Sequence, residues 1–413
     1  MSDKISQKGG IGQETTQSGR YLWIVLSLIT GAALSQALMR QGLPVLYPFV
    51  QDEFGLSRAQ VGLITSAQAI GFAVAVIMAG WLTDTFGVKR MVTIALLSLA
   101  AFTLAFPLAY SFSIVLALTT LLAIIASPVH PATTLAVIDW FPVRTRALAM
   151  SIKQMGIPLA GTLAAALLPA LALVIGWRMA AAATSLFVLA IAISFIFLYR
   201  NAPRNTQAIH KFNLASLKTI LRNRGLVTNL LWGSAFIGLQ FVALSYFMLF
   251  LIEELELSAI MAGGMLAIAQ ASSIIGRVMW GAVSDFVFRG RRLVVLAITG
   301  FLTVSWMLGI SLLDVGVSSV MVYLTAIVIG ISTLSFHGVL NILWGEQAEA
   351  GQVGVTIGIA SAVAHVSMMV MPPLFGYLVD ISSSYSLGWT VTAAVALAST
   401  LALLTFGKEP QRR

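Results

Sequence analysis

The sequence predicts an all-α polytopic membrane protein with twelve transmembrane helices. Of its 413 residues, 59% are apolar and 9% are charged, and the charged share is about a third of that expected of a soluble domain. A membrane helix needs about 20 apolar residues, and stretches of that length recur twelve times between Tyr21 and Phe406. Strands of a membrane barrel would instead show about 10 residues of alternating polarity, a pattern that this sequence lacks.

The spans follow one another with short polar interruptions. The first is much longer than the apolar core of a signal peptide and has no small-residue cleavage site after it, so we expect it to remain in the protein. Residues 1–20 and 407–413 are predicted tails, and the Gly-, Ser- and Gln-rich composition of the first indicates disorder. The predicted spans are 21–49, 60–82, 91–109, 114–141, 148–174, 179–199, 226–252, 259–283, 293–313, 319–344, 355–379 and 389–406.

Lysine and arginine are concentrated in alternate loops. Because basic loops are retained in the cytoplasm, we predict a cytoplasmic (inner) membrane protein with these loops and both termini in the cytoplasm. The opposite loops hold only Arg58 and Arg178 among the basic residues. A solvated inner face accounts for the net charge of +9, so we assign no nucleic-acid partner. The cytoplasmic set is Lys4, Lys8, Arg20, Lys89, Arg90, Arg144, Arg146, Arg200, Arg204, Lys211, Lys218, Arg222, Arg224, Arg289, Arg291, Arg292, Lys408, Arg412 and Arg413.

The longest interruption divides the chain into two halves of six spans. It is the basic segment 200–225, which we predict to be a cytoplasmic linker between the halves 21–199 and 226–406. Within it, Phe212 to Asn223 has the pattern of an amphipathic helix lying along the membrane surface.

The two halves have similarly spaced ionisable residues in equivalent spans. His130 and Asp139 are nine residues apart in the fourth span, and His337 and Glu346 are nine apart in the tenth, its counterpart. Internal repeats are typical of secondary transporters, in which the substrate site lies near mid-membrane between two halves that move about it.

A short polar loop also recurs. It reads Gly-Trp-Leu-Thr-Asp-Thr-Phe-Gly-Val-Lys-Arg in the first half and Gly-Ala-Val-Ser-Asp-Phe-Val-Phe-Arg-Gly-Arg-Arg in the second. We interpret each copy as a gate whose glycines permit a tight turn and whose salt bridges break on opening. The alternative is a set of retained basic residues beside a turn. The predicted gating residues of these loops are Gly80, Asp84, Gly87, Lys89, Arg90, Gly281, Asp285, Arg289, Arg291 and Arg292.

This pattern resembles the major facilitator superfamily, whose loop between spans two and three reads Gly-x-Leu-x-Asp-x-x-Gly-x-Lys/Arg-Arg. The resemblance covers essentially the whole chain. It implies two pseudo-symmetric six-helix bundles, a central cavity, alternating access and a monomeric protein. The second copy departs from the pattern by carrying Phe288 and Arg289 before its glycine. The segment from Gly156 to Gly161 only loosely resembles the Gly-Pro-rich motif of drug/proton antiporters, which disfavours an exporter.

Arg277 is the first candidate substrate ligand. It lies eight residues before Asp285, about 12 Å along a helix, and charges at such depth are costly unless they face a cavity or a partner. The segment around it is similar to the eighth span of the oxalate/formate exchanger and monocarboxylate transporter families, where an arginine at this place binds the substrate carboxylate. The planar guanidinium suits that role. The alternative is a structural pairing with a neighbouring helix.

Two further basic residues lie within spans and are also candidate substrate ligands. Arg40 of the first span is placed similarly to an arginine of organic-anion symporter families, but the acid that often precedes it there is replaced by Met39. Alternatively, Arg40 reaches outward to lipid headgroups. Lys153 of the fifth span either faces the cavity or reaches the inner interface.

The proton-coupling candidates are histidines, because imidazole changes charge near neutral pH. Three of the four lie in spans: His130, His337 and His365. Each is otherwise a packing residue that makes hydrogen bonds. His337 is favoured, since Asn341 lies one turn away on the same face, and both are candidate substrate ligands.

Asp139 and Glu346 lie near the cytoplasmic ends of their spans. We expect them to pair as gates with Arg144, Arg146 or Lys153 rather than to carry protons.

The sequence shows no phosphate-binding loop, no metal-ligand spacing and no nucleophile constellation, so it supports neither an ATP-driven pump nor an enzyme, and we expect no cofactor. We predict a secondary active transporter that takes up a small organic anion, a carboxylate, together with protons. The alternatives are a proton-driven exporter of amphipathic compounds and a transporter-like nutrient sensor, which would normally carry an added cytoplasmic domain or a long tail.

Overall fold

The computed structural model describes residues 11–202, 224–347 and 353–409, and every regular element in these ranges is a helix. The helices are α1 (Ile11–Phe54), α2 (Arg58–Phe86), α3 (Val88–Thr103), η1 (Phe106–Leu108), α4 (Phe112–Ala126), α5 (Val129–Trp140), α6 (Val143–Ile175), α7 (Trp177–Leu198), α9 (Arg224–Glu253), α10 (Ala259–Ala282), η2 (Val283–Val287), α11 (Arg292–Ile310), α12 (Ser319–Ile331), α13 (His337–Gln347), α14 (Val353–Ser382) and α15 (Tyr385–Phe406).

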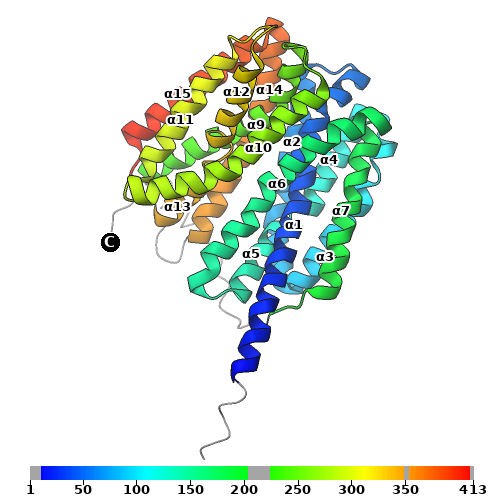
Figure 1. The fold of residues 1–413 in the computed structure, drawn as a ribbon, viewed down its shortest axis with the longest axis vertical. Helices are drawn as coiled ribbons and strands as arrows, with labels where there is room; N and C mark the ends of the chain where they lie inside the picture. Colours follow the sequence, from blue (N-terminus) through cyan, green and yellow to red (C-terminus); the bar gives the residue numbers. More distant parts are fainter. Residues whose placement is uncertain (1–10, 203–223, 348–352, 410–413) are drawn as a thin grey trace, which may run out of the picture.

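These helices occupy all twelve predicted span positions. Ten helical segments of the described chain are long and apolar enough to cross a membrane. The 29-residue α2 stands at the second position, and the short apolar α12 is continued by α13 at the tenth. Helices α1 to α7 form one half and α9 to α15 the other (Figure 1), and the predicted fold class is confirmed.

Two spans predicted as continuous are broken in the middle. The fourth is interrupted at Ser127 and Pro128, between α4 and α5, because proline lacks the N–H that would continue the helix. The tenth is interrupted between α12 and α13. There the hydroxyl of Ser332 donates to the Val328 carbonyl at 2.5 Å, and Thr333 accepts from the Trp306 indole at 2.8 Å. The backbone leaves the α-helical pattern one residue later, where the Leu334 N–H donates to the Ile329 carbonyl, five residues earlier, at 3.2 Å.

The chain ends and the linker differ in part from expectation. Helix α1 begins at Ile11, so residues 11–20 of the predicted disordered tail are helical, continuous with the apolar span that follows. The predicted surface helix from Phe212 to Asn223 lies outside the described residues. Helix α9 begins at Arg224, two residues before the predicted seventh span.

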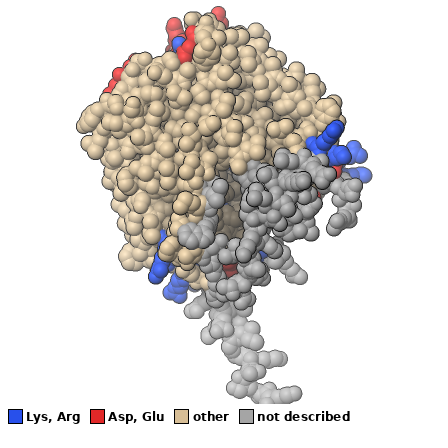
Figure 2. Space-filling model, turned by 180° about the vertical axis from the view of Figure 1, so that it is seen from behind, with Lys and Arg blue, Asp and Glu red and all other residues tan. Residues whose placement is uncertain are grey.

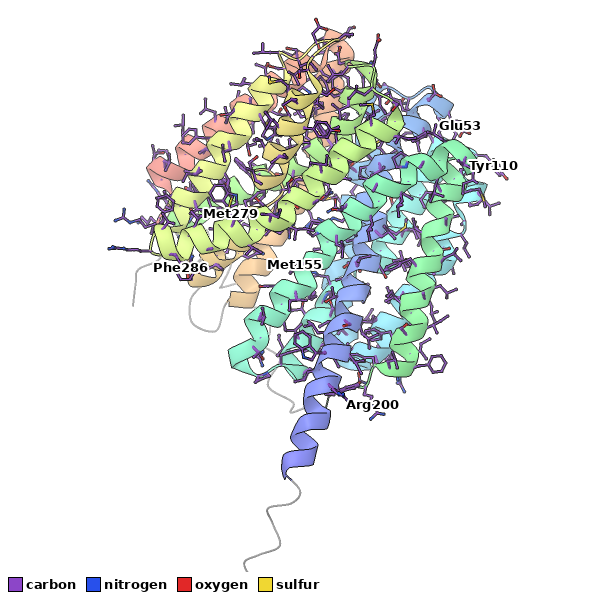
Figure 3. The ribbon with its side chains drawn as sticks, in the orientation of Figure 1. Glu53, Tyr110, Met155, Arg200, Met279 and Phe286 are labelled. Carbon is purple, nitrogen blue, oxygen red and sulfur yellow. The ribbon has the colours of Figure 1, made fainter. Side chains whose placement is uncertain are left out.

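The bundle has two chemically different ends. The terminal end is the one where α1 begins and α15 finishes, and the other is called the opposite end here. Figure 3 places Glu53 at the opposite end and Arg200 at the terminal end. On the face seen in Figure 2, acidic side chains gather at the top, the opposite end, whereas lysines and arginines gather lower down. This distribution follows the loop charges of the sequence.

The two halves are joined most closely toward the opposite end. Helix α2 packs against α14, α6 against α10, and α1 against α9. A Cβ atom at Gly62 of α2 would lie 2.5 Å from the backbone nitrogen of Pro373 on α14, so this contact requires glycine. Toward the terminal end, the ribbons of α5 and α6 diverge from those of α10 and α13 (Figure 1).

Candidate functional site

Arg40 lies on α1 and is directed at the second half of the protein. Its guanidinium carbon is 4.8 Å from the ring centroid of Phe241 on α9, a distance typical of a cation–π contact. Its Nε is buried and has no hydrogen-bond partner. The alternative of an arginine reaching outward to lipid headgroups therefore does not describe this structure.

Arg277 approaches from the second half, on α10. Its Nη2 donates to the Leu334 carbonyl at 3.3 Å, in the break between α12 and α13, while its Nε is buried without a partner. Arg40 is close enough for the two positive charges to repel each other. The broken tenth span thus supplies a carbonyl that holds the guanidinium in place.

Lys153 and His130 are two further basic residues of the first half. The side chain of Lys153 on α6 is buried, and its Nζ donates to the hydroxyl of Thr134 on α5 at 2.7 Å. His130, also on α5, is solvent-accessible and lies within electrostatic reach of Lys153 and Arg40.

The other two span histidines belong to the second half. His337 stacks on its neighbour Phe336, with ring centroids 4.4 Å apart, and its Nδ1 is buried without a partner. It lies within electrostatic reach of Arg277, and Asn341 follows one turn later on α13, partly exposed. His365 on α14 stacks flat on Phe72 of α2, with centroids 4.9 Å apart.

The predicted ligands and proton-coupling candidates therefore converge on one region between the halves. Among the described residues, no aspartate or glutamate lies in this region, because each of them is in a loop or near a helix end. The recorded ion pairs also lie at the ends, as Arg58–Glu253, Arg58–Asp380, Arg178–Glu53, Arg292–Asp285 and Arg292–Glu346. We refer to Arg40, Arg277, Lys153, His130, His337 and His365 as the basic cluster.

A cavity of about 40 Å³ adjoins Arg40. By this measure it holds about three water molecules. It lies between helices of the first half and α14 of the second, and it is lined by Gln36, Met39, Arg40, Leu43, Gln68, Phe72, Thr119, Leu122, Ala123, Ala126, His365 and Met368.

The second predicted gate loop forms a charge cluster within its own half. Arg292 at the start of α11 donates to the Ser284 hydroxyl at 2.7 Å, contacts Asp285, and lies 3.4 Å from Glu346 of α13. Arg289 and Gly290 have positive φ angles of 51° and 80°, which form the turn before α11. The cluster ties η2, α11 and α13 together.

The first gate loop is described only in part. Gly87 has a φ of 80°, the tight turn expected there, and the Lys89 N–H donates to the Asn201 side chain at 3.0 Å. Arg90 is exposed. The side chain of Asp84 and the surroundings of Gly80 lie outside the description.

Glu346 has a partner other than the expected Arg144, Arg146 or Lys153 in the described residues. Glu346 pairs with Arg292 of its own half, Arg146 donates to the Ile138 carbonyl at 2.9 Å, and Lys153 bonds Thr134. The physical reason is that the two halves diverge toward the terminal end in this conformation (Figure 1). The side chain of Arg144 is not among those described.

Several residues of the site, and of the contact between the halves at the opposite end (called the joint below), were not singled out from the sequence. Gln270 of α10 donates to Gln41 of α1 at 3.1 Å, which links the two halves beside Arg40. At the opposite end, Arg58 pairs with Glu253 at 2.8 Å. The signal for the glutamines was present, since a polar side chain within an apolar span is costly and usually functional. Arg58 and Glu253 are ordinary loop charges in sequence.

The match to a family model decides which family the chain belongs to. The model of the Major Facilitator Superfamily matches residues 29–346. The chain belongs to this superfamily. It is a membrane transporter and not an enzyme, and the resemblance seen in the sequence is confirmed.

Relatives of similar length match nearly the whole chain. The hexuronate transporter of Bacillus subtilis (strain 168) is 23% identical over 401 residues, which span 93% of this chain and 94% of that one. The probable L-galactonate transporter of Escherichia coli (strain K12) is 22% identical, covering 97% and 92%.

Solved structures show the same fold at low identity. A bacterial homologue of the human lysosomal transporter Spinster, inward-facing and unoccupied, has a TM-score of 0.74 at 18% identity, covering 94% of this chain and 98% of that one. A D-xylose–proton symporter has a TM-score of 0.75 at 15% identity, covering 95% and 99%.

Proposed function

We propose that this transporter takes up a small organic anion, a carboxylate, across the cytoplasmic membrane with protons as the coupling ion. The observation that supports an anion is the pair Arg40 and Arg277. Each half supplies one of them, their charges repel, and each has a buried Nε without a partner. A carboxylate between them would relieve the repulsion and accept charge-assisted hydrogen bonds.

Two further considerations support this substrate class. The basic cluster would repel a cationic drug, which argues against a drug exporter. Relatives of similar length are named for hexuronate and L-galactonate, both of which are carboxylates.

The basic loops favour a cytoplasmic position for the terminal end. The joined opposite end then faces outward, and the conformation described here is the one closed to the outside. Proton coupling is assigned to a span histidine, because every acid of the described chain lies near an end and imidazole titrates near neutral pH.

The test is counterflow in proteoliposomes with a panel of radiolabelled mono- and dicarboxylates. We expect exchange of at least one carboxylate, and a loss of at least about 100-fold in Arg40→Gln and in Arg277→Gln. Arg200→Gln, which neutralises an arginine at the terminal end, is the matched control and should retain exchange. Full exchange in Arg277→Gln would contradict the proposed site.

A further inference from the structure

The cavity beside Arg40 has a lining suited to a carboxylic acid with an apolar body. Seven of its residues are apolar: Met39, Leu43, Phe72, Leu122, Ala123, Ala126 and Met368. Phe72 and His365 present a flat stacked pair of rings from the two halves, and Met368 adds a soft, polarizable side chain that is buried. Most of this wall can therefore contact carbon but cannot bond a hydroxyl group.

The polar members of the lining are largely committed to the protein. Gln36 donates from Nε2 to the Ala126 carbonyl at 2.9 Å, and the Thr119 hydroxyl donates to the Val115 carbonyl at 2.7 Å. Gln68 keeps one buried amide oxygen without a partner. The main group left to bind a ligand's charge is the Arg40 guanidinium, which forms no ion pair with any acid of the described residues.

We propose that the cavity takes a small monocarboxylate with an apolar body, rather than a polyhydroxylated sugar acid. This rests on the proposed function and narrows its substrate class. The carboxylate would bind Arg40, and the body would lie against Phe72, Leu122 and Met368. A sugar acid would bring several hydroxyl groups to a wall that offers them few partners, which is unfavourable. The small volume favours a body of only a few carbons.

Two acids of equal size distinguish a site for an apolar body from a site for a hydroxylated one. 2-Methylbutanoate and glycerate have the same skeleton, but two methyl groups of the first are hydroxyl groups in the second. Calorimetric titration of the purified full-length protein in detergent would measure the binding of each, with glucuronate as a larger sugar acid. We expect 2-methylbutanoate to bind ~10- to 100-fold more tightly than glycerate.

Variants of the wall give the second measurement. Met368→Gln places an amide in the wall and should weaken 2-methylbutanoate ~10-fold, whereas Met369→Gln, at a neighbouring exposed position, should leave it unchanged. Ala123→Ser adds one hydroxyl group and should act in the same direction as Met368→Gln if the latter fails to fold.

The binding results distinguish a failure of this proposal from a failure of the proposed function. Glycerate or glucuronate binding as tightly as 2-methylbutanoate would overturn the apolar-acid proposal while leaving an anion transporter in place. Equal binding in wild type, Met368→Gln and Ala123→Ser would also overturn it. If none of the three acids binds and counterflow finds no carboxylate exchange, the proposed function fails as well.

Discussion

The carboxylate of Asp380, near the end of α14, caps the first turn of α2 from the other half of the protein. It accepts hydrogen bonds from the backbone N–H groups of Arg58 and Ala59, each at 2.9 Å. A carboxylate at a helix N-terminus satisfies unpaired donors and interacts favourably with the helix dipole. Because the donors and the acceptor belong to different halves, this cap exists only while the opposite end is closed.

Neighbouring contacts reinforce the same joint. The Arg58 guanidinium donates to Glu253 at 2.8 Å, and the Tyr246 hydroxyl donates to the Arg58 carbonyl at 2.7 Å. Deeper in the bundle, Thr65 and Ser245 share a hydrogen bond of 2.9 Å between the halves. Opening this end must therefore break several polar contacts together.

The first prediction concerns the cap. Asp380→Asn should weaken closure of the opposite end, because hydrogen bonds to a charged acceptor contribute about 2 kcal/mol. The chain has no cysteine, so Ser245→Cys provides a single reporter at a fully buried position of the joint. We expect Asp380→Asn to raise its labelling rate by an impermeant maleimide added on the Arg58 side about tenfold or more.

Asp52→Asn is the control for this experiment. Asp52 is an exposed acid at the same end, so its neutralisation changes the local charge without removing the cap. Equal labelling in Asp380→Asn and Asp52→Asn would show that the cap does not hold the joint.

The second prediction concerns the contact of α2 with α14. In Gly62→Ala, the new Cβ would lie 2.5 Å from the backbone nitrogen of Pro373, and a backbone atom cannot move aside as a side chain can. The helices must then separate, so we expect transport to fall about tenfold or more and the Ser245→Cys reporter to become accessible. Gly264→Ala has no atom within 4 Å of its Cβ and should transport normally. Wild-type rates in Gly62→Ala would contradict this account.

The sequence predicted the helices better than their contacts. Span positions depend on local hydrophobicity, and most helix boundaries differ from those predicted by only a few residues. Both mid-span breaks were missed. Proline does not by itself mark a break, since α1, α6 and α14 contain prolines without interruption, and the break between α12 and α13 contains no proline at all. That break matters for the site, since it frees the Leu334 carbonyl for Arg277.

The sequence also did not predict the contacts between segments that are distant along the chain. Arg40 and Arg277 were found because a charge in an apolar span is conspicuous. The aromatic partner of Arg40, Phe241, is one of 22 phenylalanines, and nothing in the sequence distinguishes it. The pairing of Arg58 with Asp380 joins residues 322 positions apart, and no local pattern specifies it.

The third prediction concerns Lys153, whose side chain is 1% exposed and bonds Thr134. A buried ammonium without a counterion is costly, so an apolar replacement of similar volume should stabilise the fold. We expect Lys153→Met to raise the thermal midpoint in detergent by about 2 °C or more while lowering carboxylate counterflow. Thr134→Val, which removes only the hydrogen-bond partner, should lower the midpoint. Unchanged counterflow in a stabilised Lys153→Met would exclude the lysine from substrate binding.

The last prediction separates proton coupling from substrate binding. His337 has a buried Nδ1 without a partner and lies within electrostatic reach of Arg277. A proton taken up there would therefore act directly on the counter-charge that we propose for the substrate. We expect His337→Gln to retain carboxylate counterflow, which needs no net proton movement, and to lose accumulation driven by an imposed pH gradient. His210→Gln, at the one histidine outside the predicted spans, is the control and should accumulate normally. If His337→Gln still accumulates substrate in response to the gradient, the proton is carried by another group. The same pair of assays on His130→Gln and His365→Gln would then identify which of the remaining two span histidines carries it.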